Sequence, residues 1–124
     1  MENLSTGMKL FLAGTALVLT IVLGMILNRT GKPYHTALFT FHKLIALAGF
    51  ILLLLMVIQS IRTAGAGTLM IVLVFATGIA FAGILLSGAM MSLDKQFRMM
   101  QVLHQVCTVV YFFASGGILW KIFA

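Results

Sequence analysis

The sequence predicts an all-α membrane protein, a four-helix bundle whose helices cross a bilayer alternately up and down. Composition is the first observation: 62% of the 124 residues are hydrophobic and 8% are charged, which is outside the range of soluble globular domains. The second is that the apolar residues form four runs separated by short polar segments. Each run has about 20 residues or more, enough to span a hydrocarbon core of roughly 30 Å as a helix.

In chain order, the predicted helices cover residues 8–28, 36–60, 67–91 and 97–123. The first ends at the polar stretch NRTGKPY, the second at QSIRTAGAG and the third at SLDKQF. The runs are too long and too uniformly apolar for the strands of a β-barrel. No small-residue cleavage site follows the first run, so we interpret it as a membrane span rather than a signal peptide. Residues 1–124 are therefore expected to form one integral membrane domain.

The net charge of +6 indicates membrane topology rather than nucleic-acid binding. The first and third loops and the helix ends beside them carry Arg29, Lys32, Lys43, Lys95 and Arg98, against Asp94. The opposite side carries Lys9, Arg62 and Lys121, with Glu2. Because cytoplasmic loops are enriched in positive residues, we expect both termini outside, in the plasma membrane of a bacterium or an archaeon.

Two histidines, His42 and His104, lie inside apolar runs, in the stretches FTFHKLIAL and QVLHQVCTV. The pattern indicates two helix hairpins in tandem, with one of these histidines at the equivalent place in the second helix of each. Aligning the two histidines also brings Thr15 onto Thr77. The second and fourth helices of such a bundle run parallel and lie diagonally across its core. Both imidazoles are therefore expected about 10 Å inside the same membrane face.

An imidazole at that depth needs a partner, because hydrocarbon offers none. One interpretation is structural, with hydrogen bonds to Ser87, Gln101 or a backbone carbonyl of a neighbouring helix. The other is a haem b held between the two imidazoles, which completes six-coordinate iron and favours electron transfer. Zinc would need three or four protein ligands, and copper would be expected to recruit methionine or cysteine sulfur. The matched depth of His42 and His104 favours haem, with these two histidines as the iron ligands.

Further residues fit such a haem site. Small residues would make room for the ring: Gly24, Gly49, Gly83, Ser87 and Gly88. Gly49 lies two turns beyond His42 and hence on its helix face. The anionic propionates would lie toward the nearer face, where they could pair with Arg29, Lys32, Lys43, Lys95 and Arg98. Small-residue helix packing and topology-determining charge are the alternative interpretations of these residues.

His35 lies two turns before His42, near the membrane surface. It could hydrogen-bond a propionate or a quinone carbonyl, or it is a solvated loop histidine. The single cysteine, Cys107, allows no intramolecular disulfide and is interpreted as a small apolar packing residue.

In the stretches HKLIALAGFILLLL and LHQVCTVVYFF the chain resembles small bacterial four-helix membrane b-type cytochromes and, more loosely, the cytochrome b561 superfamily. The resemblance implies a bound haem b with His42 and His104 as its axial ligands. The chain departs from two-haem members because it has no second intramembrane histidine pair. A transmembrane relay between two haems within this chain is therefore not expected.

The expected function is one-electron transfer with quinone or a redox partner protein, since the loops are too short to build a substrate site. The chain would act either alone or as a haem-bearing subunit of a membrane oxidoreductase, and the sequence leaves a homodimer or larger complex open. A small proton-coupled transporter is one alternative, although both acids, Glu2 and Asp94, lie outside the apolar runs. A structural or assembly subunit without a cofactor is the other.

Overall fold

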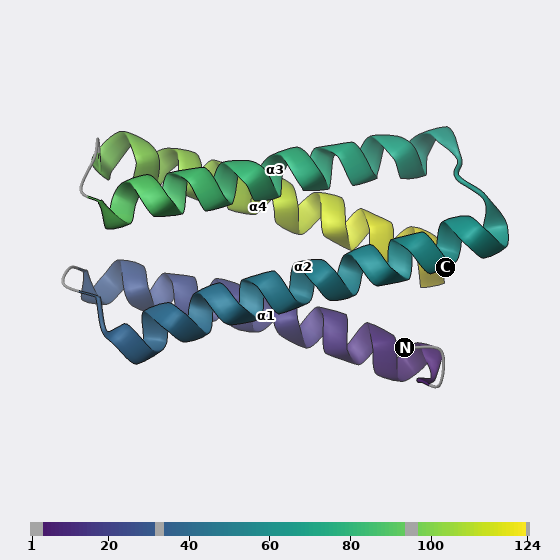
Figure 1. Cartoon of the computed structure of the whole chain (residues 1–124), viewed down its shortest axis with the longest axis horizontal. Helices are drawn as coiled ribbons and strands as arrows, with labels where there is room; N and C mark the ends of the chain where they lie inside the picture. The colour runs from purple at the N-terminus through teal and green to yellow at the C-terminus, as the bar shows by residue number, and fades with distance from the viewer. Residues whose placement is uncertain (1–3, 32–33, 94–96, 124) are drawn as a thin grey trace. The chain divides into compact units, whose positions relative to one another are not determined.

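The computed structural model describes residues 4–31, 34–93 and 97–123, and within these ranges the regular structure is helical (Figure 1). The helices are α1 (Thr6–Thr30), α2 (Thr36–Ala64), α3 (Thr68–Ser92) and α4 (Phe97–Phe123). These bounds confirm the predicted all-α class and place each helix within four residues of its predicted ends. The predicted loop residues Lys32, Asp94 and Lys95 lie outside the described residues, as does Glu2.

Local hydrogen bonds explain where the helices begin and end. α1 begins after Ser5, whose hydroxyl accepts a hydrogen bond from the Met8 amide at 3.2 Å, as an N-cap residue does. It ends at Gly31, which has a φ of 67° and donates its amide to the Leu27 carbonyl at 3.0 Å. Glycine adopts this left-handed conformation without steric cost. The connection between α2 and α3 contains a second such residue, Gly65, with a φ of 77°.

All four helices are long and apolar enough to cross a membrane, with candidate spans of 25, 29, 25 and 26 residues. Many large apolar side chains point outward, including Phe75, Ile79 and Phe113. Such a surface is stable in hydrocarbon and would drive aggregation in water. The chain is therefore an integral membrane protein.

The chain divides into two compact units, Met1–Thr63 and Ala64–Ala124. The first contains the α1–α2 hairpin and the second the α3–α4 hairpin, which Figure 1 shows as successive pairs of helices along the chain. This division matches the tandem hairpins expected from the sequence. That the two hairpins form a single domain over residues 1–124 stays a prediction.

Small residues allow the two helices of each hairpin to approach closely. In the first hairpin, a Cβ atom added to Gly49 would lie 3.1 Å from the Ala16 Cβ. In the second, a Cβ atom added to Gly83 would lie 2.6 Å from the Cys107 Sγ. Close backbone approach at small residues is the usual packing mode of membrane helices, where dispersion rather than the hydrophobic effect drives association.

Candidate functional site

His104 occupies a niche between α3 and α4, which we call the His104 niche and define by Ile84, Ser87, Gly88 and His104. The Nδ1 atom of His104 lies 3.1 Å from the Ser87 hydroxyl and 3.2 Å from the Ile84 carbonyl oxygen. A Cβ atom added to Gly88 would lie 3.5 Å from the Cε1 atom of the ring. The imidazole is therefore seated against a glycine of the preceding helix.

The hydrogen bonds in this niche determine which ring nitrogen of His104 carries the proton. Ser87 is fully buried, and its hydroxyl donates to the Gly83 carbonyl at 2.6 Å. The Ile84 carbonyl can only accept. Nδ1 must therefore be the protonated nitrogen, with its N–H directed at the Ile84 carbonyl and the Ser87 oxygen. In the neutral imidazole, Nε2 then carries the lone pair of the ring.

His42 occupies a similar niche between α1 and α2, the His42 niche, which consists of Thr20, Gly24 and His42. The backbone of Thr20 lies near enough to the ring to act on it as a hydrogen-bonding group. Because amides inside a helix are used by the helix itself, the carbonyl is the group able to accept from the ring. A Cβ atom added to Gly24 would lie 3.1 Å from Cε1 of His42, and the Nδ1 atom is buried. This ring is in tighter contact with its glycine than the ring of His104.

The two niches have the same internal geometry along the first helix of each hairpin. In each, the backbone group that bonds the histidine precedes the contacting glycine by one helical turn, Thr20 before Gly24 and Ile84 before Gly88. These equivalent residues are 64 positions apart, whereas the two histidines are 62 apart. In the structure, the first helices of the two hairpins therefore align at an offset of 64 residues, two more than the offset of 62 that aligns the histidines.

Buried positions along the helices agree with these two registers. On the first helices, Thr77 is 3% exposed and corresponds to Ala13, which is 4% exposed, rather than to Thr15. On the second helices three buried pairs keep the 62-residue register: Leu53 and Ser115, Met56 and Ile118, and Val57 and Leu119. The hairpins are thus structural repeats that differ by two residues in the length of chain between glycine and histidine.

The glycines that were expected to make room for a haem ring divide into two groups. Gly24 and Gly88 contact the imidazoles, whereas Gly49 contacts Ala16 and Gly83 contacts Cys107. The packing interpretation therefore describes Gly49 and Gly83, and Cys107 is a packing residue as expected. Ser87 hydrogen-bonds His104 directly, which is the partner that the structural interpretation expected for it.

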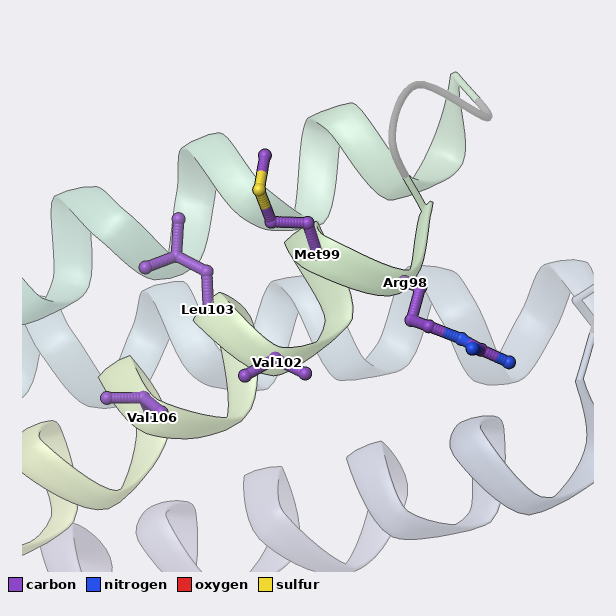
Figure 2. Close-up of a pocket in the computed structure, with 5 residues that line it drawn as sticks. All are labelled: Arg98, Met99, Val102, Leu103 and Val106. Carbon is purple, nitrogen blue, oxygen red and sulfur yellow. The ribbon is translucent and has the colours of Figure 1, made fainter.

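Of the cations assigned to propionates, Arg29, Lys43 and Arg98 are described and exposed, whereas Lys32 and Lys95 lie outside the described residues. Arg29 is in the last turn of α1, and the Lys43 Nζ lies 4.1 Å from the centre of the Phe39 ring. Both belong to the end of the first hairpin that also holds His42. Arg98 begins a groove on α4 with four apolar residues (Figure 2).

His35 lies at the beginning of α2, where it caps the helix. Its Nδ1 accepts a hydrogen bond from the Leu38 amide at 3.4 Å, and its carbonyl accepts one from the Phe39 amide at 2.9 Å. The side chain is exposed. A local role at the helix start therefore accounts for His35, while a contact with a propionate or quinone stays a prediction.

Sequence reasoning missed Thr20 and Ile84, the two residues whose backbone holds the imidazoles. A backbone acceptor carries no side-chain signal, so only the distance of one turn to a glycine could have pointed to them. Among residues 4–31, 34–93 and 97–123, no three histidine, cysteine or acidic side chains gather as a metal-binding group. Among these residues, each hairpin thus provides one histidine inside its apolar run, His42 or His104, while His35 lies at the start of α2.

Comparisons with known proteins identified no relative: no family model matches the chain, and neither does any curated protein or solved structure. The resemblance to b-type cytochromes stays a prediction. Function is therefore argued from the chemistry of the two niches.

Proposed function

We propose that this protein is a membrane b-type cytochrome in which His42 and His104 would hold one haem b. The observation that carries the proposal is the hydrogen bonding of His104. A metal-ligating histidine almost always donates its other ring N–H to a carbonyl, a carboxylate or water, which fixes the ring and its tautomer. The Nδ1 atom of His104 lies 3.2 Å from the Ile84 carbonyl, so the lone pair on Nε2 suits an iron ligand.

The His42 niche supports the same role for the second ligand. Its ring is also held by a backbone group, that of Thr20, and is seated on Gly24. His42 and His104 follow the first residues of α2 and α4 by six and seven positions. At a rise of 1.5 Å per residue, each imidazole lies about 10 Å along its helix. Two neutral imidazoles at matched depth are the ligand set of a six-coordinate haem.

When bound, the haem would supply one-electron transfer, and the partner would be quinone or a redox protein. Ile84, Ser87 and Thr20 would keep the two rings in position. The apolar helices would exclude water and lower the local dielectric, which are conditions that tune a haem potential. Arg29 and Lys43 are the described cations on the His42 hairpin that would pair with propionates.

Charge also supports an orientation for the protein. In the sequence, five cations belong to the first and third loops and the helix ends beside them, against three on the opposite side: Arg29, Lys32, Lys43, Lys95 and Arg98 against Lys9, Arg62 and Lys121. Positive residues are retained on the cytoplasmic side. We therefore propose that these ends face the cytoplasm of a bacterial or archaeal cell and that both termini lie outside.

A structural role for the histidines would also use the hydrogen bonds to Ser87, Ile84 and Thr20. An optical spectrum separates the two functions. The full chain, purified in detergent from cells supplied with haem precursor, is expected to show a sharp α-band after dithionite reduction. His42→Ala and His104→Ala should each abolish the band, whereas His35→Ala should retain it, because His35 lies at the exposed start of α2 and is not one of the two proposed ligands.

A different result would identify the structural role. If the wild-type protein is folded by circular dichroism but colourless, and stays so after reconstitution with haemin, the cytochrome proposal is wrong. Loss of the band in all three variants would also contradict the assignment of ligands, because the control histidine would then matter equally.

A further inference from the structure

A separate site lies at the N-terminal end of α4. An open groove there is lined by Arg98, Met99, Val102, Leu103 and Val106. Figure 2 shows Met99 and Leu103 on one edge, Val102 and Val106 on the other, and Arg98 extending away at the end where α4 begins. The groove therefore combines one cationic end with an apolar floor.

This groove faces away from the His104 niche. Successive residues of an α-helix are about 100° apart around its axis, which places the centre of the groove about 170° from His104. The niche side of α4 packs against α3, where His104 contacts Ser87. Arg98 is consequently better placed to contact a molecule bound in the groove than a haem bound at His104. The site is thus independent of the proposed haem.

The chemistry of the groove suits an amphiphile with a negative head. Its four apolar residues are between 41% and 57% exposed, although they belong to a helix that crosses the membrane. The Arg98 side chain is exposed and lies at the start of α4. A guanidinium binds phosphate through two parallel hydrogen bonds. From Arg98 to Val106 the groove extends about 12 Å along the helix.

We propose that this groove binds one anionic phospholipid, with the phosphodiester at Arg98 and an acyl chain along Met99, Val102, Leu103 and Val106. The membrane depth of each part is appropriate, since Arg98 is the second residue of α4 and the apolar residues continue into the span. An anionic lipid is favoured over a zwitterionic one because its net charge is opposite to that of Arg98. Each cation near an anionic headgroup gives a preference of about fivefold.

Native mass spectrometry of the full chain in a neutral detergent tests the proposal. The probe is an equimolar mixture of dioleoyl phosphatidylglycerol and dioleoyl phosphatidylcholine, which share their acyl chains. We expect the first bound lipid to favour phosphatidylglycerol by about fivefold or more. Arg98→Gln should lower this ratio about fivefold. Arg62→Gln, which removes a cation at the far end of α2, should change it less than about twofold.

A double variant tests the apolar part of the site. Val102→Ser with Val106→Ser should lower binding of both lipids about threefold or more, because buried methyl groups are lost, while the ratio between the lipids is retained. Circular dichroism would establish that each variant keeps its helix content, and the haem band should be unchanged in all of them.

Two results would overturn the proposal. Equal ratios for the wild type and Arg98→Gln, or equal losses in Arg98→Gln and Arg62→Gln, would show that lipid selection is not located at this groove. A spectrum in which the chain is dimeric, takes up no phosphatidylglycerol and dissociates on Arg98→Gln would assign the groove to a second copy of the chain instead.

Discussion

The two hairpins place a histidine in the same way but hold it by different means. In the first, the ring has one described backbone partner, at Thr20, and the closer contact with its glycine. In the second, the ring bonds both the Ile84 carbonyl and the Ser87 hydroxyl, and the contact with Gly88 is an ordinary one. In the 64-residue register, the position of Ser87 is occupied by Leu23 in the first hairpin. The first hairpin thus has a closer contact between ring and glycine where the second has the hydrogen bond to the Ser87 hydroxyl.

This difference shows which features a repeated hairpin must keep. Both hairpins retain a glycine under the ring and a backbone acceptor one turn before it, despite the two-residue difference in chain length. Side-chain partners differ between them. The helix backbone therefore defines the niche, and side chains adjust it. Five substitutions in the two hairpins, each with a comparison variant, follow in order of decreasing expected effect.

The tightest helix contact belongs to the second hairpin, at Gly83. Gly83→Ala should lower the free energy of unfolding by about 1–3 kcal/mol, because the new methyl group would overlap the Cys107 thiol. Unfolding by SDS in mixed micelles, followed by circular dichroism, measures the change. Gly78→Ala on the same helix is the control, since nothing lies within 4 Å of a Cβ atom there.

A double variant locates the cause of this loss. Adding Cys107→Ala to Gly83→Ala should recover most of the lost stability, because the two positions are coupled through one contact. If the double variant is as unstable as the sum of the single ones, the overlap with the thiol is not the reason.

The glycines beneath the two rings should respond unequally. Gly24→Ala would place a methyl group 3.1 Å from the ring of His42 and should cost about 1 kcal/mol of stability. Gly88→Ala would place it 3.5 Å from the ring of His104, an ordinary contact, and should change stability by less than about 0.5 kcal/mol. The same unfolding measurement compares them. Equal losses would remove the distinction between a tight and a loose niche.

Ser87 provides a side-chain bond at the position that Leu23 occupies in the first hairpin. Ser87→Ala should cost about 0.6 kcal/mol, the average for hydrogen bonds between membrane helices. Ser92→Ala is a matched control, because the Ser92 hydroxyl also bonds a carbonyl of its own helix, that of Ala89 at 2.9 Å, but lies at the exposed end of α3. A larger loss in Ser92→Ala would show that helix back-bonding, and not the contact with His104, is what matters.

The smallest effect is expected at the other end of the first hairpin. There the Lys9 Nζ donates a hydrogen bond to the Gln59 side-chain oxygen at 3.2 Å. Lys9→Met should lower the free energy of unfolding by less than about 0.5 kcal/mol, because the bond is only partly buried. Lys121→Met in the last turn of α4 serves as the comparison. A loss above about 1 kcal/mol would place Lys9 among the residues that hold the hairpin together.

Much of the fold could be predicted from the sequence because hydropathy is a strong signal. Apolar runs and their polar interruptions located all four helices to within four residues, and the matched histidines indicated two hairpins. Partners were harder to predict. Ser87 was named among the hydrogen-bonding candidates, but Thr20 and Ile84 act through their backbones, which every residue possesses. The roles of Gly49 and Gly83 also depend on which helix faces them, and uniformly apolar helices carry little directional pattern.

The central claim is that each hairpin supplies one imidazole to the same iron. Electron paramagnetic resonance of the oxidised protein tests it most directly, because six-coordinate haem with two imidazoles gives a low-spin ferric signal. We predict one low-spin species in the wild type, its conversion to high spin or its loss in both His42→Ala and His104→Ala, and partial recovery with added imidazole. A high-spin wild type, or a low-spin signal that persists in either variant, would contradict the account.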